Sequence, residues 1–389
     1  MTNIFDVLII GGGVHGASLA FHLASRGVKL AVLEKRFIAA GATGRSSGLV
    51  RMHYDLEAEA RLAHVSFGYF TDWRGRVGGD CGFTRTGFLQ LVKRDQNEAL
   101  KANVAAQQRI GIRTEVIVAE DVHRLAPEFT VDDIEFAAYE PDSGYADPTL
   151  TASSLLAAAR ARGATFVQDC LVKGISVANG RVTGVSTSKG DFSAPIIVNA
   201  AGAWGKQICQ MAGLDLPLST WRHETMFVRR PPELSAPHLT VIDFPNSMYF
   251  RPEGQELTLV GLEDGNPLGE SPEGDADHAR PGFVEAAIER ICERIPKMEN
   301  AHLHGAHGGY DGITPDQHPA LGPIGPDGFF LDTGFSGTGF KIAPAVGLCM
   351  AEWILDGAPG TVDISLFSPS RFSDGRQIQG EYPYESIWR

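Results

Sequence analysis

The chain has 389 residues, of which 34 are basic and 47 acidic, and its net charge of −13 argues against general affinity for nucleic acid or anionic membranes. Its length predicts roughly two or three structural units, and no apolar run reaches the roughly 18 residues of a membrane span. Five scattered cysteines form no CxxC pair, which indicates neither a disulfide framework nor a zinc site.

Residues 6–34 have the pattern of a strand, a glycine turn, a helix and a second strand. Val7–Ile10 is a continuous apolar run, typical of a parallel strand buried on both faces. Gly11, Gly13 and Gly16 follow at the spacing that permits a tight turn, close approach of a pyrophosphate and close packing of helix on sheet. The run has no basic leader before it, so we expect no signal peptide and a cytoplasmic protein.

The second strand of this unit, Leu30–Leu33, ends at an acidic residue. Glu34 lies where a dinucleotide ribose needs a hydrogen-bond acceptor. The helix between the strands presents free N–H groups and a positive dipole end to the phosphates. The sequence therefore predicts a dinucleotide site, which at this point fits either a nicotinamide cofactor or FAD.

The middle of the chain alternates helices and strands. The small-residue loop 39–48 suits close approach to phosphate or a flat ring. We expect helices at 55–74, 95–110, 120–125 and 151–162, strands at 83–93 and 116–118, and a meander of strands at 165–168, 171–178 and 181–188. Asn179-Gly180 is a hairpin turn signal in that meander. A further buried strand, 196–199, leads into the small-residue turn 200–205.

From residue 221 the pattern changes to short alternating strands, which predict an antiparallel sheet. We expect these strands at 223–229, 240–243, 247–251 and 256–262. The acidic, Gly- and Pro-rich stretch 263–282 is long for a compact domain, and we interpret it as a mobile flap or an oligomer contact. Near the C-terminus, strand 329–332, glycine loop 333–340 and helix 341–356 form a second place where a helix N-terminus can face an anionic ligand.

Six motifs in this order resemble the D-amino acid oxidase superfamily of FAD-dependent amine oxidoreductases, in particular its sarcosine oxidase and N-methyl amino acid dehydrogenase branch. They are GGGVHG at 11–16, GATGRSSGLVR at 41–51, GYADP at 144–148, VNAAGAW at 198–204, TPDQHPALG at 314–322 and GFSGTGFK at 334–341. The resemblance implies an α/β fold with an FAD-binding Rossmann-like domain (1–85, 145–215, 305–389) and an α+β substrate domain with an antiparallel sheet (86–144, 216–304).

The resemblance also implies which residues bind FAD. Those implied for the adenosine-pyrophosphate part are Gly11, Gly13, Val14, His15, Gly16, Glu34, Lys35 and Val172. Those implied for the pyrophosphate loop and the flavin are Thr43, Gly44, Arg45, Ser46, Ala201, Gly202, Trp204, Gly337, Thr338, Gly339, Phe340 and Lys341. The helix after the last loop would stabilise an anionic reduced ring through its dipole.

Four residues are implied for the substrate. Arg51 and Lys341 match the pair that holds the substrate carboxylate in sarcosine oxidases, since a guanidinium offers a two-pronged donor and an ammonium a point charge. Tyr249 and Arg251, on the antiparallel sheet, are candidates for the roof of the pocket. No metal is expected.

Two departures from the branch bear on chemistry. The stretch 307–313 contains no cysteine, whereas some sarcosine oxidases tether the flavin just before the TPD motif, so we expect non-covalent FAD. No lysine occurs from residue 207 to 296, and Leu259 stands where oxidases of the branch place the lysine that promotes reaction with oxygen. A cation there would stabilise superoxide. Its absence indicates a dehydrogenase or a slow oxidase, with oxygen or a carrier as acceptor.

The expected reaction is oxidation of the C–N bond of a small, N-substituted amino acid by hydride transfer to flavin, followed by hydrolysis of the imine. Three alternatives stay open from the sequence. They are oxidation of a D-amino acid or 2-hydroxy acid on the same scaffold, a flavin-binding subunit of a hetero-oligomer, and a nicotinamide dehydrogenase, which a colourless protein would reveal. A homo-oligomer is equally compatible with the sequence.

Overall fold

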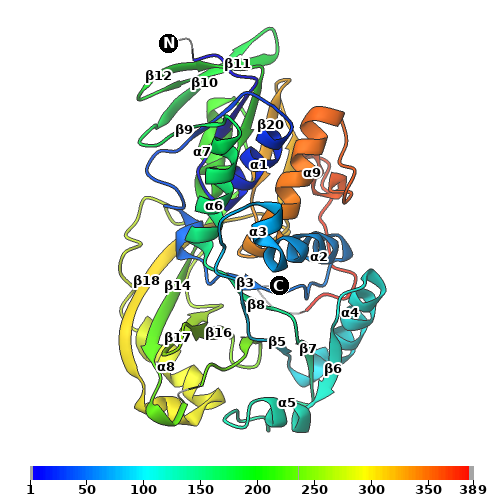
Figure 1. Cartoon of the computed structure of the whole chain (residues 1–389), viewed down its shortest axis with the longest axis vertical. Coiled ribbons are helices and arrows are strands. Elements are labelled where there is room, and N and C mark those ends of the chain that lie inside the picture. The colour runs from blue at the N-terminus through cyan, green and yellow to red at the C-terminus, as the bar shows by residue number, and fades with distance from the viewer. Residues whose placement is uncertain (1–2, 235, 385–389) are drawn as a thin grey trace.

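The structure is a computed structural model that describes residues 3–234 and 236–384. Two large sheets occupy its two halves: a six-stranded sheet with helices packed on it, and an eight-stranded sheet (Figure 1). A small sheet of β3 (Leu49–Val50), β8 (Gly144–Tyr145) and β4 (Thr84–Arg85) lies where the chain crosses between them. The mixed α/β architecture expected from the sequence is confirmed.

The six-stranded sheet has the order β19-β20-β13-β1-β2-β9, and all its pairs are parallel except β19–β20. Its strands are β1 (Val7–Ile10), β2 (Leu30–Leu33), β9 (Thr165–Val167), β13 (Ile196–Asn199), β19 (Ala320–Pro323) and β20 (Phe329–Thr333). β1 and β2 are wholly buried, as their unbroken apolar runs predict. Helix α1 (Val14–Ser25) packs between α6 (Pro148–Ala161) and α9 (Ala343–Asp356) on this sheet.

Glycines set the close packing at the start of α1. A Cβ on Gly16 would lie 2.1 Å from the Gly11 carbonyl oxygen, and one on Gly11 would lie 2.4 Å from the carbonyl oxygen of Ala200. Gly11 also has a φ of +118°, in the region that favours glycine. The turn can therefore bring the helix start, β1 and the end of β13 together only because these positions carry no side chain.

The meander differs from the sequence expectation in two strands. It consists of β10 (Val172–Ala178), β11 (Arg181–Thr187) and β12 (Gly190–Ser193), with the predicted turn at Asn179-Gly180, where both residues have positive φ. Strand β9, predicted as part of the meander, instead pairs in parallel with β2, because α6 carries the chain back across the six-stranded sheet. Strand β12 was missed because only one of its four residues is buried.

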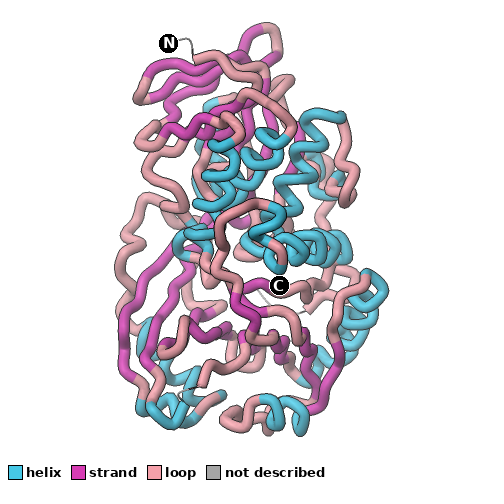
Figure 2. The backbone as a smooth tube through the Cα atoms, viewed as in Figure 1, coloured by secondary structure: helices cyan, strands magenta, loops and turns pink. Residues whose placement is uncertain are grey.

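The eight-stranded sheet has the order β18-β14-β17-β16-β15-β5-β7-β6. Its strands are β5 (Phe88–Leu91), β6 (Glu115–Val118), β7 (Phe136–Glu140), β14 (Ser219–Arg229), β15 (Thr240–Asp243), β16 (Met248–Glu253), β17 (Leu257–Leu262) and β18 (His302–Ile313). Helix α8 (Phe283–Arg294) packs its apolar side against one face of this sheet. The long strands β14 and β18 run side by side (Figure 2).

The remaining helices are distributed over both halves of the fold. They are α2 (Glu57–Thr71), α3 (Trp73–Arg76), α4 (Asn97–Ile110), α5 (Ala119–Leu125), α7 (Gly205–Met211) and the short α10 (Ser370–Ser373). Strand β18 is continuous to Ile313, so the expected boundary between 304 and 305 lies inside it. We therefore propose that the chain returns to the cofactor half after Ile313. Among the described residues, no helix combines the length and apolarity that crossing a membrane requires.

Residues 263–282, which we call the acidic segment, lie against the chain's own cofactor half. The Glu273 carboxylate accepts a hydrogen bond from Lys35 Nζ at 3.0 Å and another from the Trp204 indole. Asp277 accepts a hydrogen bond from Arg45. These contacts make the acidic segment a strap between the end of β17 and the loop after β2, because its carboxylates face cations of that loop. The mobile flap or oligomer contact expected from the sequence stays a prediction.

Candidate cofactor and substrate site

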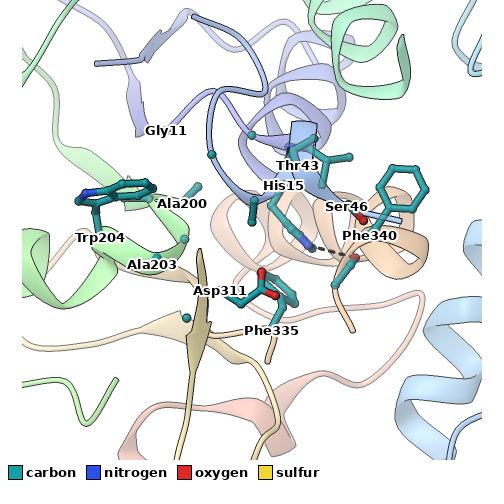
Figure 3. A pocket seen from close by; sticks show the side chains of 18 of the residues that line it. Gly11, His15, Thr43, Ser46, Ala200, Ala203, Trp204, Asp311, Phe335 and Phe340 are labelled. Carbon is teal, nitrogen blue, oxygen red and sulfur yellow. Dashed lines mark hydrogen bonds between the residues drawn. The ribbon is translucent and has the colours of Figure 1, made fainter. Parts of the chain in front are cut away.

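A cavity of about 310 Å³ lies between the carboxyl ends of strands in the six-stranded sheet and one face of the eight-stranded sheet (Figure 3). It is lined by the turn after β1, the end of β2, the small-residue turn 200–204 and the glycine loop 334–341. On the opposite side it is lined by Trp221, His223, Ile242 and Tyr249. This is the position in which open α/β sheets bind their ligands.

One end of the cavity is built for an anion and a ribose. The helix α1 begins at Val14, whose backbone N–H is held by Thr43 Oγ1 at 3.0 Å. The Glu34 carboxylate accepts hydrogen bonds from the backbone N–H groups of Gly12 at 2.7 Å and Arg36 at 2.8 Å. These bonds fix the acidic residue beside the glycine turn. The open helix end stabilises negative charge next to it.

The glycine loop at the C-terminal end of β20 is pinned to α1 by His15. Its Nε2 lies 3.1 Å from the Gly339 carbonyl oxygen, and its ring stacks on Phe335 with the centroids 3.5 Å apart (Figure 3). A Cβ on Gly339 would lie 2.6 Å from Phe335 and 2.8 Å from His15. Burial lowers the pKa of His15 to about 3, so the ring is neutral and its Nε2–H donates to the carbonyl.

Asp332, the penultimate residue of β20, places a buried carboxyl in the cavity wall. The neutral His15 ring lies beside it, with Nδ1 3.5 Å from Oδ1 of Asp332. Neither of its oxygens accepts a hydrogen bond from another described residue. Burial raises its pKa to about 7. The wall thus offers a polar group that a hydroxylated ligand can satisfy.

The other end of the cavity gathers two buried cations. Arg51 is 2% exposed and Lys341 7% exposed, and both line the cavity. The Arg51 guanidinium carbon and Lys341 Nζ lie 4.8 and 5.2 Å from the centre of the same Tyr54 ring. Burial, followed by the charge of Arg51, lowers the pKa of Lys341 well below its ordinary value, although Glu59, Glu263 and Glu140 oppose the change. An incoming carboxylate would favour the ammonium form.

A histidine–carboxylate pair faces the cavity from β14 and β18. His223 Nδ1 lies 2.9 Å from Asp311 Oδ2, and its Nε2 lies 3.1 Å from the Arg45 carbonyl oxygen. Burial lowers the pKa of His223, but the Asp311 carboxylate outweighs it, and the net pKa lies above its ordinary 6.5. Because both ring nitrogens face acceptors, the imidazolium form can donate to both.

Most of the residues implied by the family resemblance line this one cavity. They are Gly11, Gly13, Val14, His15, Glu34, Lys35, Thr43, Ser46, Arg51, Val172, Ala201, Gly202, Trp204, Tyr249, Gly337, Thr338, Gly339, Phe340 and Lys341. Four others do not line it. Gly16 and Gly44 shape the backbone, and a Cβ on Gly44 would lie 2.5 Å from the Ala39 carbonyl oxygen.

The other two residues outside the cavity wall are arginines. Arg45 donates to Asp277 and to the carbonyl oxygen of Ala276 in the acidic segment. Arg251 donates to the carbonyl oxygen of Ser47 and to Glu253, which ties β16 to the loop before β3. Both therefore hold the walls of the cavity together from outside it.

Several cavity residues were missed by the sequence reasoning: Trp221, His223, Glu263, Asp311 and Asp332. Each lies in or directly after a strand, where alternation shows that one face is buried but not which face meets the ligand. The Asp332 position carried one usable signal, a carboxylate at the end of an otherwise apolar buried strand.

The cavity has the parts of an FAD-binding oxidoreductase, and comparison with known proteins agrees. Residues 6–353 match the family model described as DAO, FAD dependent oxidoreductase, and the chain belongs to that family.

Individual relatives extend this result. The chain is 31% identical over 372 residues to mitochondrial sarcosine dehydrogenase of Mus musculus, covering 91% of this chain and 40% of that protein. It is 28% identical to sarcosine oxidase subunit beta of Rhizobium meliloti, with 97% of this chain and 92% of that subunit covered. The crystal structure of L-proline dehydrogenase from P. horikoshii superposes with a TM-score of 0.90 at 27% identity, covering 97% of this chain and 100% of that one.

Proposed function

We propose that the chain oxidises the C–N bond of a small, N-substituted amino acid and transfers the hydride to FAD, which gives an imine that hydrolyses in water. The observation that carries this proposal is the pairing of Arg51 and Lys341, two buried cations at the end of the cavity formed by the glycine loop. The names of the relatives, sarcosine and L-proline enzymes among them, support a secondary amine as the substrate.

The two cations would anchor the substrate carboxylate. A guanidinium can bind both oxygens, and an ammonium adds a point charge, so the pair fixes both the position and the orientation of a small amino acid. The substrate amine and the carbon that loses hydride would then project toward the middle of the cavity. Such positioning, with exclusion of water by Tyr249 and its apolar neighbours, is the main catalytic contribution of the protein.

The residues present fit FAD. The glycine turn and the first turn of α1 would hold the pyrophosphate, Glu34 the ribose, and the loop Gly337–Phe340 the flavin edge, while Asp332 offers its unsatisfied carboxyl to a hydroxyl. When bound, FAD supplies the two-electron acceptor for the hydride. The stretch 307–313, without cysteine, supports non-covalent binding.

A slow reaction with oxygen is part of the proposal. Leu259 is buried in β17 and is not among the residues that line the cavity. This position therefore offers no positive charge to developing superoxide. We propose a dehydrogenase, or a slow oxidase, that passes its electrons to a carrier.

The similarity to sarcosine oxidase subunit beta over nearly the whole chain favours a second possibility, that this chain is the flavin-bearing subunit of a hetero-oligomer. The mouse sarcosine dehydrogenase supports the same idea from its length, since the chain spans 40% of it. Size-exclusion chromatography with light scattering, combined with activity of the isolated chain, tests it. A monomer with full turnover counts against the subunit proposal.

The test of the proposed reaction is an anaerobic spectral titration of the FAD-loaded chain against N-methyl, cyclic and D-amino acids and a 2-hydroxy acid. Bleaching of the flavin absorbance by sarcosine, N,N-dimethylglycine or L-proline supports the proposal. Reduction by the hydroxy acid alone contradicts the substrate class.

A cytoplasmic location is also proposed. It rests on the free thiols of Cys81, Cys170, Cys209, Cys292 and Cys349, which suit a reducing compartment. Several relatives carry mitochondrial names, so fractionation of the source cells is the deciding measurement.

A further inference from the structure

A carboxyl group shares the substrate end of the cavity with the two cations. Glu263 directly follows strand β17 and is the first residue of the acidic segment. It is 8% exposed and lines the cavity together with Arg51, Lys341 and Tyr249. Its backbone N–H donates to the Ser247 carbonyl oxygen at 2.9 Å, which fixes its position relative to β16.

The ionisable groups around Glu263 come from several separate parts of the chain. Arg51 and Lys341 stabilise its carboxylate, while Asp243 of β15 and Asp264 beside it oppose ionisation, and the Tyr249 hydroxyl lies within electrostatic reach on β16. Burial is the largest influence, and the pKa of Glu263 stands well above its usual value. A carboxylate of raised basicity is a better proton acceptor than an exposed one.

The shared cavity wall and the charge interactions with both cations put this group in the part of the cavity that the amine of a bound substrate would occupy. In an amino acid the nitrogen is separated from the carboxylate carbon by a single carbon atom. A substrate whose carboxylate is anchored on Arg51 and Lys341 therefore holds its nitrogen close to those cations. Glu263 is the acidic lining residue that interacts with both of them.

We propose that Glu263 binds the ammonium group of the incoming amino acid and accepts its proton; the inference rests on the proposed function. An N–H bond of the ammonium breaks, an O–H bond forms on the Glu263 carboxylate, and the nitrogen keeps its lone pair. Only this neutral amine can form the C=N bond as hydride leaves carbon. The step itself is a proton transfer and needs no oxidant.

The proposal makes a specific prediction for pH. Amino acids reach the site as zwitterions, because an alkylammonium group has a pKa of about 10, like that of lysine. The second-order rate constant for flavin reduction is divided by the association constant of methoxyacetate at the same pH, which removes the titration of Lys341. With Glu263 as acceptor, the rate constant corrected in this way is level between the pKa of Glu263 and that of the amine. Without an acceptor, only the small neutral fraction of the amino acid can react, and this fraction grows about tenfold per pH unit. The corrected rate constant therefore rises about tenfold per pH unit up to pH 10.

The experiment is anaerobic stopped-flow reduction of the FAD-loaded chain by sarcosine and L-proline from pH 7 to 10. The variants are Glu263→Gln, which keeps the shape but cannot accept the proton, and Glu263→Asp, which restores a carboxylate. Asp264→Asn is the matched control, because its carboxylate pairs with Arg290 at 2.9 Å and does not line the cavity. Binding of methoxyacetate, the ether analogue of sarcosine without an ammonium group, reports an intact carboxylate site.

We expect a level profile for the unchanged chain, D264N and E263D, with a lower rate for E263D, and a tenfold rise per pH unit for E263Q. Methoxyacetate should bind E263Q no more weakly than the unchanged chain. An E263Q profile as level as that of the unchanged chain, or a D264N profile as steep as that of E263Q, overturns the role of Glu263 alone. An unchanged chain whose flavin none of these amines reduces refutes the proposed function instead.

Discussion

Replacement of Asp332 by Asn should stabilise the FAD-free chain, and the gain should depend on pH. The carboxyl is fully buried, and burial raises its pKa from the ordinary 3.8 to about 7. Between these two values the native state holds a proton that the unfolded chain has lost. Its free energy of unfolding therefore falls as pH rises. Each pH unit is worth about 1.36 kcal/mol, so the carboxylate costs about 4 kcal/mol above pH 7.

Asn keeps the shape of Asp332 without the charge, so the free energy of unfolding of D332N does not fall in this way as pH rises. The difference in stability should be small near pH 4, grow through pH 7 and level off at about 4 kcal/mol. Urea unfolding at pH 5 and 8, followed by tryptophan fluorescence, measures it. The FAD-free chain is used because bound cofactor adds its own binding free energy to the result.

A second buried aspartate is the control for this experiment. Asp316 accepts hydrogen bonds from Arg371 at 2.8 and 3.0 Å, and this partner overcomes burial and lowers its pKa. D316N should therefore destabilise the chain at both pH values, by about 3 kcal/mol, because it leaves a buried guanidinium without its counter-charge. Equal stability changes for D332N at pH 5 and 8 would refute the reasoning.

Three further results are expected. Methoxyacetate, bound through the ammonium form of Lys341, should bind the unchanged chain most tightly at low pH and lose affinity as pH rises. The Lys341→Met variant should bind methoxyacetate at least about tenfold more weakly, with little dependence of the affinity on pH. His223 should titrate above pH 6.5 in NMR spectra. Its contribution to the free energy of unfolding is therefore complete below pH 6.5 and is lost as pH rises through the pKa of the folded state. In Asp311→Asn the pKa of His223 should fall below 6.5. Glu273→Gln, which weakens the contacts to Lys35, should speed FAD release at low salt; unaltered release in a filter-binding time course would count against the strap.

Local patterns determined the cofactor half to a large extent. The apolar runs of β1 and β2, the three glycines between them and the acid at Glu34 interact within one short segment, so chain order alone predicts their geometry. The glycine loop before α9 is predictable for the same reason, since small residues followed by a helix form a local anion site.

The sequence predicted where strands occur better than it predicted which strands pair with one another. Thr165–Val167 has the composition of a strand in either sheet, and only the path of α6 decides that it pairs with β2. From its composition the acidic segment is interpreted as a mobile flap or an oligomer contact. In the fold it meets Lys35 and Arg45, residues more than 200 positions earlier in the chain, which no local pattern can reveal.

At the substrate end of the cavity, too, sequence motifs pointed to individual residues, whereas only the tertiary structure showed which of them lie together. Arg51 and Lys341 could be singled out because each sits in a recognisable motif, but nothing in their neighbourhoods shows that both approach one tyrosine ring. Glu263 stands among exposed acids in the sequence, yet it is buried beside these cations because β17 ends against the cofactor half. The sequence by itself determined a dinucleotide-binding unit, through contacts between near neighbours. The tertiary structure decided which charges meet in the cavity, because that depends on how two sheets from distant parts of the chain pack together.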